Sequence, residues 1–182
     1  DERLPAAVKP MEAELGTRNK KPENLLKLAQ HEITLKDWVK EHKGYRKYVA
    51  IAGKCWPAFQ TQFGFVPCYV NSRLTAEGIP VSCEVDIYGA LSEFIGTVVS
   101  EDTVTLLDIN NTVPADMYKE DIEGKFKYTQ KDTFMGFHCG NTASQKLSFC
   151  EMKNQMIMAR TLPEEVTQGT LEGDIIPGDI TF

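Results

Sequence analysis

Helix-like and strand-like segments alternate between residues 23 and 109, and this alternation restricts the fold of the chain more than any other feature. Apolar residues recur at helical spacing in some segments, whereas others are short apolar runs typical of buried strands. The expected helices are 23–42, 67–78 and 87–98, and the expected strands are 48–53, 79–83 and 103–107. A chain with this order of helices and strands can form only a parallel or mostly parallel sheet.

The sequence therefore predicts an α/β chain in which residues 1–112 are the C-terminal part of a Rossmann-like domain. The polar, proline-containing stretch before Glu23 is expected to be a surface connection with one short helix. Beyond residue 110 short β-prone runs follow, so residues 113–182 are expected to begin a β-rich, barrel-like domain. These runs lie near residues 126–129, 133–137, 155–159 and 169–176. Because the final strand-like segment, residues 175–182, ends without a cap or polar tail, we expect a fragment of a longer protein.

Composition excludes several classes of protein. With 42% hydrophobic residues in 182, the chain is too apolar to be disordered. No run approaches the roughly 20 apolar residues of a membrane span, and no apolar signal segment follows Asp1, so we expect a cytoplasmic protein without a membrane partner. The 20 basic and 26 acidic residues give a net charge of −6, which makes nucleic acid an unsuitable partner.

The five cysteines carry no recognisable chemistry. Their number is odd and no CxxC pair occurs, so reduced thiols are expected rather than a zinc site or a disulfide framework. Cys55 and Cys83 follow predicted strands, but no histidine lies near them to activate a nucleophile. No glycine-rich nucleotide loop is present either.

Two carboxylates follow predicted strands, at the sheet edge where α/β proteins bind ligands. Glu84 comes after the run 79–83 and Asp108 after the run 103–107. Such a pair can hold a hard divalent cation or exchange protons with a substrate. The alternative is that either residue caps a helix, although Asp86 is the better cap for the helix that follows.

The histidines differ in their surroundings. His31 and His42 belong to the first predicted helix and are expected at the surface. His138 ends a β-prone run between two glycines that allow close backbone approach, so it could face a ligand or lie in an ordinary turn.

Several ordered motifs resemble one known family. They are KCWPAF (54–59), PCYVNSRLTAEGIPVSCEVDIYGAL (67–91), TLLDINN (105–111), GFHCGN (136–141) and GTLEGDIIPGDITF (169–182). Together they resemble the L-fucose isomerase and L-arabinose isomerase superfamily, and most closely its fucose-isomerase-like members. The resemblance spans roughly residues 45–182, from the end of the middle domain into the C-terminal domain.

This resemblance implies a Mn²⁺-dependent aldose–ketose isomerase that acts through an enediol. Glu84 and Asp108 look like the family's metal-binding and acid–base carboxylates. His138 and Asn141 would then lie in a loop that contacts the sugar, and the family's third ligand, a histidine, would lie beyond Phe182. The resemblance also implies a homo-oligomer, and a fragment that alone binds Mn²⁺ weakly and is inactive. The sugar itself, whether L-fucose, L-arabinose, D-arabinose or a related pentose, stays open.

Two rival functions remain. A sugar-binding or regulatory homologue could retain the fold without the reaction, although the intact Glu84 and Asp108 argue against it. A metal-assisted hydrolase or aldolase would need an activated water or a Schiff-base lysine, and Lys54 has no evident desolvating partner.

Overall fold

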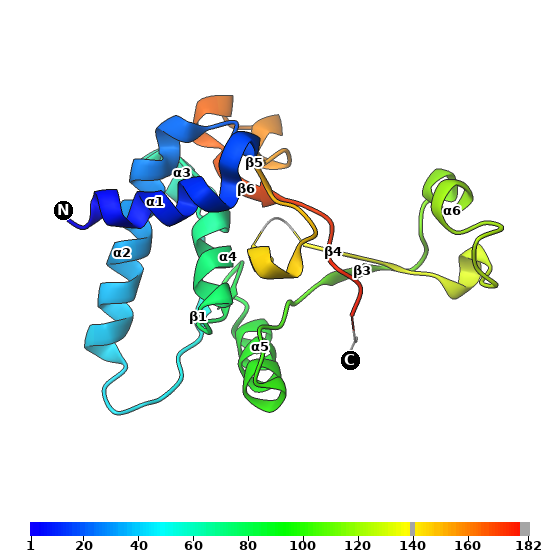
Figure 1. Ribbon diagram of the computed structural model, residues 1–182, viewed down its shortest axis with the longest axis horizontal. Coiled ribbons are helices and arrows are strands. Elements are labelled where there is room, and N and C mark those ends of the chain that lie inside the picture. The colour runs from blue at the N-terminus through cyan, green and yellow to red at the C-terminus, as the bar shows by residue number, and fades with distance from the viewer. Residues whose placement is uncertain (139–140, 179–182) are drawn as a thin grey trace. The chain divides into compact units, whose positions relative to one another are not determined.

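The computed structural model describes residues 1–138 and 141–178 of the chain (Figure 1). Contacts divide the chain into two units, one formed by residues 1–106 with 139–182 and the other by residues 107–138. These units differ from the domains expected from the sequence, whose boundary between residues 112 and 113 stays a prediction.

The first unit contains five α-helices and four strands within its described residues. The helices are α1 (Leu4–Leu15), α2 (Leu25–His42), α3 (Ala58–Phe63), α4 (Cys68–Ala76) and α5 (Ile87–Ser100). The strands are β1 (Ile51–Ala52), β2 (Val81–Ser82), β5 (Glu151–Asn154) and β6 (Gln168–Glu172). Short 3-10 turns occupy Gly16–Arg18, Pro22–Asn24, Ser144–Lys146, Met158–Arg160 and Glu164–Val166.

The helices predicted from periodicity are confirmed, and the N-terminal stretch is better ordered than predicted. Helices α2, α4 and α5 match the expected segments. The stretch before Glu23 is not a surface connection, because α1 runs for 12 residues and buries Met11 and Leu15 completely. The proline-containing, polar sequence of this stretch does not show the periodicity of a helix, because the helix is stabilised mainly by packing on its neighbours.

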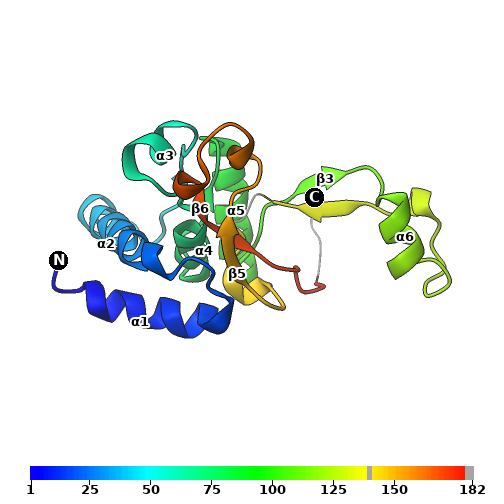
Figure 2. The same cartoon turned by 90° about the horizontal axis from the view of Figure 1, so that it is seen from above.

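The core of the first unit joins parts of the chain that are distant in sequence. It lies among α1, α2, α4 and the β5–β6 pair, which Figures 1 and 2 show grouped together. Its members include Leu28, Tyr69, Leu74, Met152 and Leu171. Residues near the C-terminal end therefore complete a core that the N-terminal helices begin.

One parallel strand pair is present, as the alternation predicted. Strands β1 and β2 pair in parallel, with Ile51 opposite Val81 and Ala52 opposite Ser82. The predicted strand at 103–107 is wrong, because this segment pairs with no strand of the described chain. Instead the side chains of Val104 and Leu106 lie against Gly96 and Gly89 of α5. The helices and short sheets agree with the α/β class, whereas a Rossmann-like sheet is not confirmed.

The second unit is an antiparallel ribbon with one short helix. It consists of β3 (Asp108–Asn110), α6 (Ala115–Asp121), a 3-10 turn (Gln130–Asp132) and β4 (Met135–Phe137). Figure 2 shows β3 beside β4, and the register places Asp108 opposite Phe137. No residue of this unit is fully buried in the described structure, so it has no core of its own.

The strand predictions for the C-terminal part are correct only in places. Strand β4 lies within the predicted run 133–137, and β6 largely coincides with the beginning of the run 169–176. The runs 126–129 and 155–159 form no strand, and β5 precedes the second of them. β5 and β6 pair antiparallel and join the core of the first unit.

Two further features of the described residues bear on the class of protein. No helix among residues 1–138 and 141–178 is long and apolar enough to cross a membrane. No disulfide joins the described cysteines Cys55, Cys68, Cys83 and Cys150, and Cys139 lies outside the described residues.

His31 is packed among aromatic rings, contrary to the expected surface position. Its ring centroid lies 5.0 Å from that of Phe59 and 5.7 Å from that of Phe65. Burial disfavours the charged imidazolium and lowers the pKa of His31 to about 4. His42, in contrast, is exposed as predicted.

We expect His31 to make the stability of the chain sensitive to acid. Because its folded-state pKa lies below the unfolded value of 6.5, its contribution is fully present above pH 6.5 and is lost as the pH falls toward 4. The loss between pH 7.5 and pH 5 should be roughly 2 kcal/mol in the free energy of unfolding. Urea unfolding at both pH values should show this loss in the wild type and in His42→Gln, and not in His31→Phe. An equal loss in all three would contradict the assignment.

Candidate active site

Glu84 lies where the sequence predicts, two residues after β2 ends, at the carboxyl edge of the parallel pair. The Gly53 amide donates to the Ser82 carbonyl at 2.9 Å, and the Val85 amide donates to the Gly53 carbonyl at 3.1 Å. Glu84 and Val85 have φ angles of 64° and 59°, in the left-handed region that non-glycine residues rarely adopt. This strained turn leaves the Glu84 side chain exposed. Strain of this kind clusters at functional sites.

Asp86, and not Glu84, caps the helix that follows. Its carboxylate accepts a hydrogen bond from the Gly89 amide at 2.8 Å, at the first turn of α5. Glu84 therefore does not cap this helix, which was the alternative interpretation of its position. Among the described residues, no hydrogen bond or ion pair involves the Glu84 carboxylate.

Removing the cap should destabilise the chain modestly. We expect Asp86→Ala to lower the free energy of unfolding by about 1 kcal/mol, because the Gly89 amide loses its acceptor. Asp86→Asn, which can still accept that bond, should remain close to the wild type. Chemical denaturation checks both variants, and equal losses in the two would show that the cap is not the cause.

Asp108 and His138 lie at the same end of the β3–β4 ribbon. Asp108 begins β3, whereas the sequence predicted that it would follow a strand, and His138 comes directly after β4. The Asp108 side chain is exposed and His138 is half-buried. The structure thus brings together two of the four predicted site residues within one unit.

Asn141 is buried against β2. Its side chain is 6% exposed, and its Nδ2 donates to the Val81 carbonyl at 2.8 Å. The Asn141 amide therefore binds the backbone of β2. The expected contact of Asn141 with sugar hydroxyls stays a prediction. Glu84 and Asp108 belong to different units, so their convergence on one ion also stays a prediction.

The donor chemistry of Glu84 and Asp108 fits a hard divalent cation. Both carboxylates are exposed, and neither is engaged by another described side chain. Oxygen donors of this kind suit Mn²⁺ and Mg²⁺. The described residues contain no group of three or more histidine, cysteine, aspartate or glutamate side chains placed to hold a metal. Two ligands are thus the most that these residues would supply.

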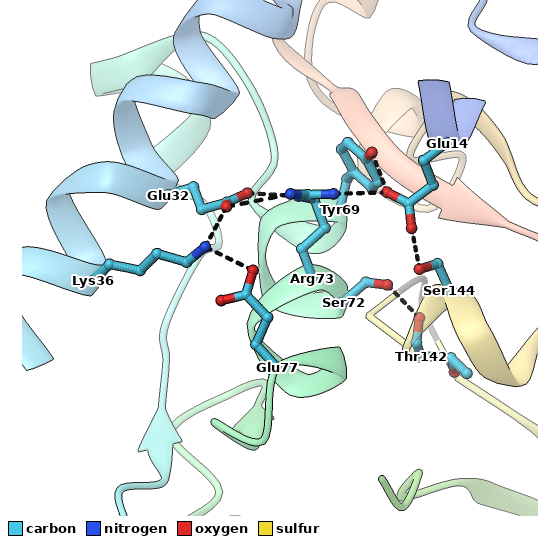
Figure 3. Close-up of polar contacts among 9 residues, drawn as sticks. All are labelled: Glu14, Glu32, Lys36, Tyr69, Ser72, Arg73, Glu77, Thr142 and Ser144. Carbon is cyan, nitrogen blue, oxygen red and sulfur yellow. Dashed lines mark hydrogen bonds and ion pairs between the residues drawn. The ribbon is translucent and has the colours of Figure 1, made fainter. Parts of the chain in front are cut away.

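A partly buried ionic network that the sequence did not predict links α2 and α4 (Figure 3). Arg73 Nε lies 2.6 Å from Glu32 Oε2, and Lys36 Nζ lies 2.6 Å from Glu32 Oε1 and 2.7 Å from Glu77. Burial acts to raise the pKa of Glu32, but the hydrogen bonds from Arg73 and Lys36 outweigh it and lower this pKa. Glu32 is therefore held as a buried carboxylate.

The network continues to α1 through Glu14. Its carboxylate accepts hydrogen bonds from Arg73, Tyr69 and Ser144, and burial together with Glu14 raises the pKa of Tyr69. Glu14, Arg73 and Ser144 border an open cleft of about 340 Å³, and Glu14 pairs with Arg73 there. Only the ion pair between Glu32 and Lys36, which are four residues apart on α2, could have been predicted from sequence spacing. The other pairs join residues from distant parts of the chain.

Comparison with known proteins finds similarity to sugar isomerases. Residues 136–182 match the model of the L-fucose isomerase C-terminal domain, a segment that begins with the GFHCGN motif. The resemblance to the L-fucose isomerase family is confirmed. The match contains His138 and Asn141, whereas Glu84 and Asp108 precede it.

Proteins similar to this chain carry the name sulfoquinovose isomerase. The protein from Priestia aryabhattai is 36% identical over 77 residues, which cover 42% of this chain and 16% of the relative. That from Clostridium sp. (strain MSTE9) is 36% identical over 88 residues, covering 42% and 20%. That from Alkalicoccus urumqiensis is 33% identical over 95 residues, covering 52% and 20%. The chain thus spans a fifth or less of these relatives. No solved structure matches it.

Proposed function

We propose that the full-length protein is a metal-dependent aldose–ketose isomerase and that Glu84 and Asp108 bind its Mn²⁺. The observation that carries the proposal is the pair of exposed carboxylates, one in a strained turn after β2 and one at the start of β3, in a chain that matches the L-fucose isomerase family. The cytoplasmic location and the homo-oligomeric state belong to the same proposal.

The reaction requires one proton to move between neighbouring carbons of the sugar. One carboxylate removes the proton from C2 of the open-chain aldose and returns it to C1, while the hydroxyl proton on O2 passes to O1. Bound Mn²⁺ would polarise the carbonyl and hydroxyl oxygens during this transfer. Glu84 and Asp108 can both bind the ion and move the proton. His138 and Asn141 are proposed to contact the sugar.

The substrate is proposed to be an aldose of the fucose or arabinose type, or sulfoquinovose. The first choice follows from the L-fucose isomerase family, and the second from the name of the relatives. Sulfoquinovose differs from the others in carrying an anionic sulfonate. A panel of L-fucose, L-arabinose, D-arabinose and sulfoquinovose therefore separates the two choices.

Isotope exchange tests the proposed reaction. Full-length protein with Mn²⁺ in D₂O should convert at least one sugar of the panel to a ketose, followed by NMR. The ketose should carry solvent deuterium at C1, because the proton held on the carboxylate exchanges with solvent before it is delivered to C1. A chelator should stop the conversion. Sugar binding without ketose formation would favour the non-catalytic homologue and contradict the proposal.

A further inference from the structure

We propose that Lys54 is a specificity-determining residue that binds the anionic group of an acidic sugar. The substrate class that follows is an aldose with a negative charge remote from its carbonyl group, as in sulfoquinovose, rather than a neutral sugar. This inference rests on the proposed function, because it names the substrate class of the same site.

Lys54 lies next to Glu84 at the carboxyl edge of the parallel pair. Lys54 comes two residues after the end of β1, and Glu84 comes two residues after the end of β2. Gly53, directly before Lys54, accepts a hydrogen bond at 3.1 Å from the amide of Val85, directly after Glu84. This bond keeps the Cα atoms of Lys54 and Glu84 within about 8 Å of each other. All four residues belong to the first unit. A ligand at this edge, where α/β sheets bind their ligands, therefore lies near both side chains.

The ammonium group of Lys54 has no protein partner in the described part of the chain. The side chain is exposed, and no ion pair or hydrogen bond with another described residue involves it. Lys146 and Lys153, in contrast, are each paired with a carboxylate. Lys54 is also the one basic residue in the sequence segments 53–57 and 83–87, which lie at the ends of the two strands. Its charge can therefore bind an anionic ligand without first breaking an ion pair.

The charges around Lys54 favour this role over a contact with a neutral sugar. Glu84 and Asp86 both follow β2, and the chain has a net charge of −6, so a sulfonate that approaches this edge meets like charges. A neutral sugar needs no compensating cation, whereas an anionic one does. Trp56, which is 46% exposed, adds an aromatic surface, and ligand sites combine such surfaces with a few polar groups.

The length of the lysine side chain suits a charge that lies away from the reacting carbons. Glu84 is proposed to act at C1 and C2, whereas the sulfonate of sulfoquinovose is attached to C6. The flexible four-carbon stem of Lys54 carries its ammonium group away from the backbone that it shares with the Glu84 turn. A lysine acts as a point charge with three donors, and it can therefore bind a sulfonate in several orientations.

Steady-state kinetics of the full-length protein with Mn²⁺ and sulfoquinovose test this proposal. We expect Lys54→Met to raise KM about tenfold and to leave kcat within about threefold, because a charge-assisted contact away from the reacting carbons is lost. Lys54→Arg, which keeps the charge, should stay within about threefold of the wild type in both constants. Lys9→Met, which removes an exposed lysine of α1, should have no effect.

Two further measurements distinguish a charge contact from a structural role. Added salt should raise KM for sulfoquinovose in the wild type and change it little in Lys54→Met, because salt screens exposed charges. Inhibition by D-glucose, which has a hydroxyl group in place of the sulfonate, should be the same in both proteins. A parallel loss of D-glucose inhibition in Lys54→Met would show a distorted site and would overturn the proposal.

The remaining outcomes separate this inference from the proposed function. An unchanged KM for sulfoquinovose in Lys54→Met would overturn the role of Lys54 and leave the isomerase assignment intact. Conversion of L-fucose or an arabinose, but not of sulfoquinovose, would do the same. Absence of conversion of every sugar of the panel would instead remove the proposed function and this inference with it.

Discussion

Glu84→Gln and Asp108→Asn are each expected to reduce isomerase turnover by the full-length protein on the order of a thousandfold or more. Each change removes a charged oxygen ligand and, for one of the two, the group that carries the proton between C2 and C1. Both side chains are exposed and make no hydrogen bond or ion pair with the described residues, so the fold should be retained.

The matched control is Glu101→Gln. This exposed carboxylate lies just after α5, where it also has a left-handed φ of 54°, but it follows a helix rather than β2. Its neutralisation should leave turnover unchanged. Near-normal rates in both Glu84→Gln and Asp108→Asn, with unchanged circular dichroism, would remove these residues from the mechanism.

Arg73→Leu is expected to have the largest effect on stability. The change leaves the Glu32 carboxylate, which is only 4% exposed, with Lys36 as its remaining partner in the network, and it also removes a hydrogen bond to Glu14. Breaking a buried ion pair on one side costs about 3–5 kcal/mol, because a buried charge loses its compensation. Urea unfolding at pH 7 measures this loss.

The pH dependence of this variant provides a second test. The pKa of Glu32 is lowered in the folded state, so the stability it contributes is present above its unfolded pKa and is lost as the pH falls through the folded value. Arg73→Leu should therefore approach the wild type in acid. Arg3→Leu, which removes the exposed ion pair with Asp37, should have a much smaller effect. An equal effect of the two arginine changes would contradict the account.

Local periodicity was sufficient to predict the elements whose apolar spacing is regular. It predicted α2, α5 and the parallel pairing of β1 with β2. It did not predict α1, because two prolines and a polar composition are unusual in a helix that buries Met11 and Leu15. It also placed a strand at 103–107, where alternating apolar side chains pack on α5 instead of pairing in a sheet.

For the candidate site, the sequence predicted features that depend on neighbouring residues, but not contacts between residues that are distant in sequence. The position of Glu84 after β2 and the cap at Asp86 follow from residues within one short segment. The contact of Asn141 with Val81, and the network around Glu14 and Arg73, join residues up to 130 positions apart. Such pairings depend on tertiary packing, which periodicity does not encode.

Anomalous diffraction at the manganese edge from crystals of the full-length protein grown with Mn²⁺ is the most direct measurement of the proposed site. The account predicts one peak per chain with carboxylate oxygens of both Glu84 and Asp108 within about 2.5 Å of it. A peak that only one of these side chains reaches, or one bound by other residues, would contradict it.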